Sequence, residues 1–316
     1  MEFHSIYYTI IEYMSQYFDQ KNMFLEPEVK QHGSHMVMTN VTMPTKEKYL
    51  TIDTRFRDEY DASALANYNI SLPERLTNVR SLEVTNMEVP ITFYNISSRI
   101  GNNTFHIKIG VMETTIKIPS GNYTESTLAS TITSTLSSQG APYNDISFTI
   151  TNKKAEFKNN GSNDCTITFD TTDCIRPSEG PMSRLGWLLG YRLKSYVLPG
   201  STDEIGESFV SINGLRYIYL ILDEYTSSNP KSFLSLSRTS QLSSQPIIAR
   251  ISMDYNDYPF GTVLSAELGS YLRSDVRSYA NEVNLQRFNI RLVDEFGSIL
   301  DLNGMDFSFC LKIQHL

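Results

Sequence analysis

The sequence lacks most of the features that mark membrane-spanning, secreted, nucleotide-binding or zinc-dependent proteins. No stretch reaches the roughly 18 consecutive apolar residues that cross a bilayer. Glu2, His4 and Glu12 stand where a secretory signal needs basic and then apolar residues, so we expect no such signal and a chain kept in the cytosol. Glycine-rich phosphate loops, H-E-x-x-H helices, G-x-S-x-G turns and paired C-x-x-C motifs are missing. The sequence therefore gives no support to nucleotide or zinc chemistry.

Cysteine and positive charge are both scarce. The chain has three cysteines, and although Cys165 and Cys174 are close enough in sequence for a disulfide across a turn, an odd count without an export signal favours free thiols. Lysine and arginine together number 27 against 35 acidic residues, which gives a net charge of −8. Sequence-independent binding of nucleic acid depends on basic side chains that neutralise phosphates, so this charge argues against nucleic acid as a partner.

Candidate catalytic and metal-binding side chains are scattered along the chain. His106 lies in the middle of a predicted strand, a position typical of a structural histidine. The stretch DYNDYPFG departs from a calcium loop because Tyr258 and Pro259 stand where a ligand and a glycine are needed. Acidic pairs near predicted turns are Asp203/Glu204, Asp223/Glu224 and Asp254/Asp257. None of these patterns identifies a site, so we expect no catalytic residue, no metal and no cofactor.

The first segment of the chain has an apolar period of three and four residues, which predicts an amphipathic helix. Its apolar residues are Tyr7, Ile10, Ile11, Met14, Tyr17 and Phe18. Residues 20–47 contain proline, glycine and polar residues without a sustained period, so we expect an extended arm and an N-terminal region of residues 1–47. The helix either docks on its own domain or contacts a neighbouring chain, and its sequence is compatible with both.

From residue 48 onward the pattern changes to the alternation of apolar and polar residues that is typical of strands. Nine segments show it: residues 104–110, 114–119, 146–151, 155–159, 165–170, 217–225, 247–255, 288–297 and 307–314. Turn formers such as Asn303-Gly304 separate them. Many strands without alternating long helices predict one all-β domain over residues 48–316, an antiparallel β-sandwich.

Two short helices are expected within this region. In TESTLASTITSTLSSQG, the four-residue spacing of Leu128, Ile132 and Leu136 predicts a helix with Thr124 as its N-cap and an end near Gly140. The second segment, SRLGWLLGYR, is too short to be stable alone, so tertiary contacts must hold it.

The second helical segment contains Trp187, the chain's only tryptophan. We expect Leu185, Leu189 and either Trp187 or Leu188 to face inward, so that the segment covers an open end of the sandwich. As such a plug, the indole of Trp187 would bury about 200 Å². The alternative is a tryptophan that stacks on a sugar or a base.

Four motifs occur in a recognisable order along residues 48–316. They are IDTRFRD at 52–58, IPSGNYT at 118–124, LGWLLG at 185–190 and DLNGMDFSFCLKI at 301–313. In this order they resemble motifs of the capsid-associated virion proteins of nucleocytoplasmic large DNA viruses, which include penton and minor capsid proteins. The run Leu185, Gly186, Trp187, Leu188, Leu189, Gly190 is similar to an LGF-type motif, and Tyr191 follows it where family members often carry phenylalanine.

The resemblance implies a jelly-roll-like sandwich and a structural, non-enzymatic role in the virion. A penton would be a homopentamer at a fivefold vertex, whereas a minor capsid protein would lie beneath the capsomers. The implied partners are the major capsid protein and other capsid proteins, close to the inner viral membrane, with assembly in the host cytoplasm. Two other classes stay open: a carbohydrate- or receptor-binding β-sandwich, and a hydrolase whose two carboxylates are brought together by the fold.

Overall fold

Strands dominate the computed structural model. It describes residues 44–61, 65–169, 180–226, 233, 242 and 245–316, together with the backbone of residues 28–32 and 35–39. This backbone forms an antiparallel hairpin of β1 (Glu28–His32) and β2 (His35–Thr39) within the predicted extended arm. The predicted helix from Tyr7 to Phe18 lies outside the described residues, so it stays a prediction.

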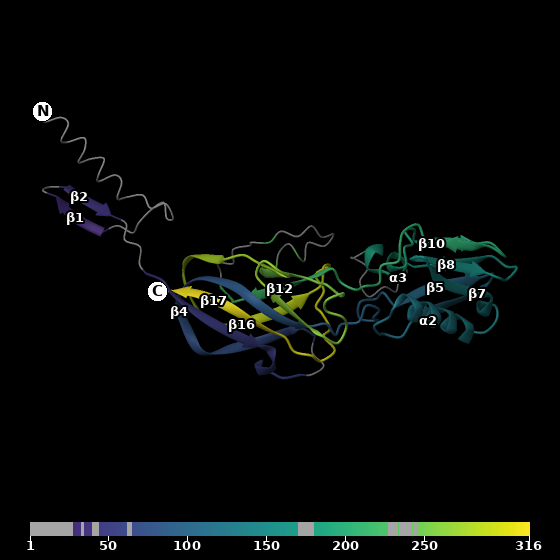
Figure 1. Cartoon of the computed structure of the whole chain (residues 1–316), viewed down its shortest axis with the longest axis horizontal. Helices are drawn as coiled ribbons and strands as arrows, with labels where there is room; N and C mark the ends of the chain where they lie inside the picture. The colour runs from purple at the N-terminus through teal and green to yellow at the C-terminus, as the bar shows by residue number, and fades with distance from the viewer. Residues whose placement is uncertain are drawn as a thin grey trace, which may run out of the picture.

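One curled antiparallel sheet forms what we call the main sandwich (Figure 1). Its strands follow the order β15-β13-β12-β16-β4-β17-β3, and β14 also pairs with β4. Their bounds are β3 (Lys46–Asp53), β4 (Asn67–Pro90), β12 (Tyr217–Asp223), β13 (Ile247–Ser252), β14 (Val263–Glu267), β15 (Leu272–Ser274), β16 (Arg277–Val293) and β17 (Ser308–His315). A 3₁₀ turn, η1 (Thr54–Phe56), follows β3.

The long strands β4 and β16 pair with each other along most of their length. Their register shifts between Ser278 and Arg287, where the ribbon bends, and Asn78 on β4 has a φ of +54°. The sequence pattern did not predict β4, because the alternation of apolar and polar residues breaks at Pro73 and again near this bend. Bulges of this kind allow one strand to line two faces of a core.

A second set of strands, the inserted sandwich, interrupts the main sandwich between β4 and β12 (Figure 1). A four-stranded sheet of order β10-β9-β5-β6 faces a three-stranded sheet of order β11-β8-β7, and the rings of Phe105 and Phe157 meet between them with centroids 5.6 Å apart. The strands are β5 (Thr104–Ile109), β6 (Met112–Lys117), β7 (Ile146–Thr151), β8 (Lys154–Asn159), β9 (Cys165–Thr168), β10 (Ser195–Leu198) and β11 (Asp203–Ile205).

Helices α2 (Glu125–Ser138) and α3 (Leu185–Leu188) belong to the inserted sandwich. The sequence predicted α2 correctly: Thr124 caps it by accepting a hydrogen bond from the backbone N–H of Thr127, and Leu128, Ile132 and Leu136 are its buried residues. Two 3₁₀ turns, η2 (Tyr143–Asp145) and η4 (Pro181–Ser183), are also described there.

The described residues thus form two large hydrophobic cores, one in each sandwich, and a smaller third cluster of Tyr219, Ile221, Leu242, Ile247 and Val293. All pairings between named strands are antiparallel, so the predicted fold class, an antiparallel jelly-roll-like β-sandwich with two short helices, is confirmed, and all nine predicted strands are present. The pattern did not separate the two cores, because alternation reports only that one face of a strand is buried. The domain boundary at residue 48 stays a prediction.

The chain crosses between the two sandwiches twice, and the buried side chain of Asn95 holds the crossings together. Its amide N–H groups donate to the carbonyls of Tyr123 (2.8 Å) and Ile212 (2.7 Å), and its oxygen accepts from the N–H of Tyr123 (2.9 Å). A buried amide with its hydrogen bonds made fixes the position of both segments.

An ion pair lies in the interior of the main sandwich. Arg277 and Glu224 have side chains that are 1% and 0% exposed, and Nη1 of Arg277 lies 2.7 Å from Oε2 of Glu224. The guanidinium also donates to the carbonyls of Leu222 and Pro246, and Tyr279 donates its hydroxyl to the same carboxylate. The network joins β12 and β16 to the segment that precedes β13.

We expect Arg277→Met to lower the free energy of unfolding by about 3–5 kcal/mol, because it leaves the buried carboxylate of Glu224 without its cation. Lys153→Met is the matched control, since it removes the exposed partner of Glu125 and should change stability by about 1 kcal/mol or less. Urea denaturation measures both. Equal losses in the two variants would contradict a structural role for the buried pair.

Candidate functional site

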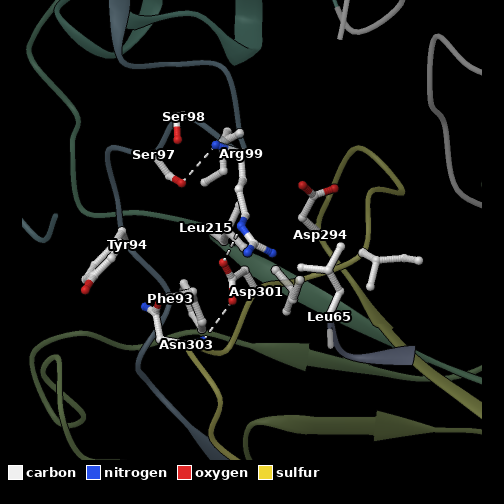
Figure 2. Close-up of a pocket in the computed structure, with 13 residues that line it drawn as sticks. Leu65, Phe93, Tyr94, Ser97, Ser98, Arg99, Leu215, Asp294, Asp301 and Asn303 are labelled. Carbon is white, nitrogen blue, oxygen red and sulfur yellow. Dashed lines mark hydrogen bonds and ion pairs between the residues drawn. The ribbon is translucent and has the colours of Figure 1, made fainter. Parts of the chain in front are cut away.

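A cleft of about 480 Å³ lies where the two sandwiches meet, and Figure 2 shows the residues around it. Its apolar wall comes mainly from Leu65, Phe93 and Leu300 of the main sandwich. The first crossing of the chain supplies Ser97, Ser98 and Arg99, and the loop after β16 supplies Asp294 and Asp301. The cleft is therefore formed by segments that are far apart in the sequence.

An ion pair closes one side of this cleft. Nε of Arg99 lies 3.1 Å from Oδ2 of Asp301, as Figure 2 shows, and both side chains are partly exposed. The other oxygen of Asp301 accepts from the N–H of Asn303, whose side chain donates to the carbonyl of Thr92. Asp301 and Asn303 belong to the closing motif, whereas Arg99 stands alone in a polar loop and had no sequence signal.

The chemistry available in this cleft suits binding rather than catalysis. Its serines have no histidine beside them, and its arginine and Asp301 neutralise each other. An apolar wall with a polar edge is the usual composition of a site that receives an apolar side chain or a small amphipathic molecule. We therefore treat it as a candidate binding cleft.

Glu295 lies beside the same junction, in a small cavity of about 50 Å³ that Asn95, Ser183 and Leu188 also line. Burial raises the pKa of its carboxyl above the ordinary value, and the neighbouring Asp294 adds to this, while Arg216, with Nε 3.7 Å from Oε2, opposes it. Oε2 itself has no hydrogen-bond partner among the described residues.

We expect Glu295→Gln to stabilise the protein at neutral pH by less than about 1 kcal/mol, a small effect because the group is only partly shielded from water. A raised folded-state pKa means that the native protein binds the proton more tightly, so wild-type stability falls as pH rises above 4.5, the ordinary value. Thermal unfolding from pH 4 to pH 8 should show the two proteins converging at low pH.

Glu267→Gln, which removes an exposed carboxylate on β14, is the control for this series. A Glu295→Gln variant whose stability relative to wild type is independent of pH would contradict the assignment.

Two of the motifs meet at one joint of the main sandwich. Thr54 of IDTRFRD donates its hydroxyl to Oδ1 of Asp306 (3.0 Å), and its backbone N–H donates to the carbonyl of Phe307 (3.0 Å). Arg57, almost fully buried, contacts the same Oδ1 and donates to the carbonyl of Thr54. The ring of Tyr68 lies 4.5 Å from the guanidinium. These residues close the end of the sheet that holds β3 and β17.

The LGWLLG segment folds as predicted in part. Leu185 and Leu189 are fully buried, and Leu188 packs against the inserted core. The buried aromatic residue of this stretch is Tyr191, whose ring lies in the inserted core and stacks on the ring of Phe169 with centroids 5.1 Å apart.

Trp187 is half-buried instead, with the guanidinium of Arg192 lying 4.0 Å from its ring centroid. Two positions along a helix turn a side chain by about 200°, so Trp187 cannot share the face of Leu185 and Leu189. The role of the segment as a plug stays a prediction.

The two glycines of this segment are required by close contacts. A Cβ on Gly186 would lie 2.4 Å from Cγ of Phe169. Gly190 has a φ of +94°, and a Cβ there would lie 2.3 Å from the carbonyl oxygen of Ser208. The N–H of Ser208 in turn donates to the carbonyl of Gly190 (2.9 Å). The spacing of the motif is thus explained by packing within the inserted sandwich.

We expect Gly190→Ala to be much more destabilising than Gly261→Ala. Gly261 has nearly the same φ, +91°, but a Cβ there meets nothing within 4 Å, so that variant should lose only about 1–2 kcal/mol from backbone strain. Gly190→Ala should lose about 2 kcal/mol more, because the backbone of Ser208 has to move. Chemical denaturation compares the two, and similar losses would contradict the packing explanation.

The candidate catalytic residues have structural partners. His106 lies in β5, as predicted, with Nε2 3.2 Å from the hydroxyl of Thr115. Glu224 is in the buried ion pair, while Asp223 accepts from the N–H of Tyr225. Asp257 accepts from the hydroxyl of Tyr271.

The remaining acidic candidates lie in a turn and in a strand. Asp254 accepts from the backbone of its own turn, and Asp203 and Glu204 lie in β11.

Cys165 is a buried free thiol, and burial raises its pKa to about 12, while Cys174 lies outside the described residues. Within the described ranges no group of three or more His, Cys, Asp or Glu side chains is arranged to hold a metal ion. In that same part of the chain, every helix is too short or too polar to cross a membrane.

Comparisons with known proteins give one family match and distant structural likenesses. Residues 37–177 match the family of unknown function DUF5901, which is less than half of the chain. No curated protein matches the sequence. The structure is similar to the mavirus penton protein, with 10% identity over 87% of this chain and 100% of that chain and a TM-score of 0.43.

It is also similar to a chain in the cryo-EM structure of the Sputnik virophage, with 13% identity over 86% of this chain and 98% of that chain and a TM-score of 0.41. Both TM-scores are below 0.5, so no residue role is transferred from these proteins.

Proposed function

We propose that this chain is a structural protein of the virion of a large icosahedral DNA virus, either a penton or a minor capsid protein. The main support for the proposal is that the motifs similar to those of capsid-associated proteins have structural roles in this fold. Thr54, Arg57 and Asp306 form a joint of the main sandwich, and Gly190 and Tyr191 complete the inserted core. Motifs used in this way hold a scaffold together, which is what a shell component needs.

The chemistry of the surface and the arm supports protein partners. A net charge of −8 disfavours contact with the packaged nucleic acid and favours assembly with other capsid proteins, including the major capsid protein. Residues 1–20 contain Glu2, Glu12 and Asp19 but no lysine or arginine. If the apolar residues from Tyr7 to Phe18 form the predicted helix, its natural receptor is an apolar groove with basic edges on a neighbouring chain. That neighbour lies in the shell or beside the inner membrane.

A second candidate function is carbohydrate binding, and one groove favours it. This groove of about 560 Å³ lies at the junction of the sandwiches and is lined by Tyr123, Tyr255 and Phe260. The exposed residues Asn122 and Asn213 stand at its edge, and no hydrogen bond of either side chain is found within the described residues. Aromatic rings beside free amides match the apolar faces and hydroxyls of sugars. Saturable binding of a defined oligosaccharide would support this candidate.

The test of the virion role is localisation within purified particles of the virus that encodes the chain. We expect quantitative mass spectrometry to find the protein at a fixed ratio to the major capsid protein after salt washing, and antibody labelling to place it at vertices or beneath the capsomers. Vertex labelling at five copies per vertex would favour the penton. Its absence from washed particles would contradict the proposal.

A further inference from the structure

Asparagine followed by glycine occurs three times in the chain, as Asn160-Gly161, Asn213-Gly214 and Asn303-Gly304. This dipeptide deamidates spontaneously with unusual ease, because glycine has no side chain to keep its backbone nitrogen away from the amide carbon of the preceding residue. The reaction requires that the asparagine side chain can turn and that the glycine nitrogen can reach it. All three asparagines are exposed, so hydrogen bonds decide which of them can react.

The first pair is held at both reacting groups. The side-chain amide of Asn160 donates to the carbonyl of Asp145 (3.1 Å) and to the hydroxyl of Ser147 (3.3 Å). The N–H of Gly161 donates to Oδ1 of Asn159 (3.0 Å). Neither the amide carbon nor the attacking nitrogen can move toward the other without breaking these bonds.

The third pair is held at its side chain. The amide of Asn303 donates to the carbonyl of Thr92 (2.5 Å), and the backbone N–H of the same residue donates to Oδ1 of Asp301 (3.0 Å). The side chain therefore has to leave a hydrogen bond to the main sandwich before it can turn toward Gly304.

The second pair has neither restraint. In the part of the chain that the structure describes, no hydrogen bond is found for the side chain of Asn213 or for the backbone N–H of Gly214. Asn213 also stands at the edge of the open groove of about 560 Å³, where water reaches both groups. Both requirements of the reaction are met at this pair.

We infer that Asn213 is a site of spontaneous deamidation, and that the fold protects the other two asparagine–glycine pairs. The modification needs only water. The nitrogen of Gly214 gives its proton to hydroxide and forms a bond to Cγ of Asn213, while the Cγ–Nδ2 bond breaks and ammonia leaves with a proton taken from water. The product is a five-membered cyclic imide.

Water then opens this imide. Its oxygen bonds to one of the two ring carbonyl carbons, the bond from that carbon to nitrogen breaks, and the nitrogen regains a proton. Opening at Cγ gives aspartate, whereas opening at the main-chain carbon gives isoaspartate, in which the backbone runs through the side chain. Either product carries one more negative charge than asparagine, and no oxidant or reductant is consumed.

The isoaspartate form disturbs the second crossing, because two anchored carbonyls flank the pair. The carbonyl of Ile212 accepts from the side-chain amide of Asn95 (2.7 Å), and that of Leu215 accepts from the hydroxyl of Tyr255 (2.8 Å). Isoaspartate adds one carbon atom to the backbone between these anchors. There is little space to absorb it, since a Cβ on Gly214 would lie 2.8 Å from the hydroxyl oxygen of Tyr255. The modification therefore weakens the attachment of the crossing.

Peptide mapping by mass spectrometry tests the site. The full-length protein is incubated at pH 8 in water enriched in ¹⁸O and then digested in ordinary water, so that only amides lost before digestion acquire the heavy isotope. We expect the label at residue 213 to accumulate several-fold faster than at residues 160 and 303. In a parallel incubation in urea we expect the three rates to converge, because the hydrogen bonds that distinguish the pairs are lost.

Thermal unfolding gives the second readout. The isoaspartate form, isolated by anion exchange and reversed-phase analysis of its peptides, should melt about 2 °C below the fresh protein because one anchoring hydrogen bond is lost. Asn213→Asp carries the same charge on an unchanged backbone and should melt like the fresh protein. Asn213→Gln keeps an exposed amide that cyclises far more slowly, so this variant should keep its melting temperature when it is aged in parallel.

Equal rates at the three pairs of the folded protein would overturn the inference, as would faster labelling at residue 160 or 303 than at residue 213. An isoaspartate form that melts with the fresh protein would overturn the effect on the crossing. The virion role is independent of both results, because particle composition tests it separately.

Discussion

The pairing of β4 with β16 is the constraint on which the rest of the molecule depends. These two strands pair over most of their length at the centre of the strand order, so the strands of the main sandwich form one continuous hydrogen-bonded sheet instead of two separate sheets. β17 and β14 add to the far half of β4, and β12 adds to β16. The buried pair of Arg277 and Glu224 fixes the start of β16 against the end of β12. Loss of register in this ribbon would displace the other strands of the main sandwich.

The sequence predicted the elements whose signal is local. The Thr124 cap and the spacing of Leu128 and Ile132 identify α2, and alternation identified nine strands, because both patterns reflect burial of one face. It did not predict β4, where Pro73 interrupts the alternation, nor the separation into two cores, which depends on contacts between residues far apart. Helical geometry left Trp187 half-buried, and Tyr191, which lies beyond the end of α3, occupies the core.

The candidate sites were less accessible to sequence reasoning. Thr54 and Asp306, in the motifs of residues 52–58 and 301–313, are 252 positions apart in the chain, and only the structure shows that they touch. The cleft at the junction depends on Arg99, a residue without any motif, and on Asp301 within one. The amino-acid composition alone predicts a negative net charge. That charge favours some classes of partner over others, but it does not show where on the surface a partner binds.

The two crossings between the sandwiches are held side by side by Asn95 on the first crossing, whose amide donates to the carbonyl of Ile212 on the second at 2.7 Å. The inserted sandwich therefore enters and leaves the main sandwich at a single place. An insertion with adjacent ends adds little strain to its host, so its length, loops and surface can diverge while the β4–β16 frame is preserved. We therefore expect differences among related chains to accumulate in the inserted sandwich before they reach the main sandwich.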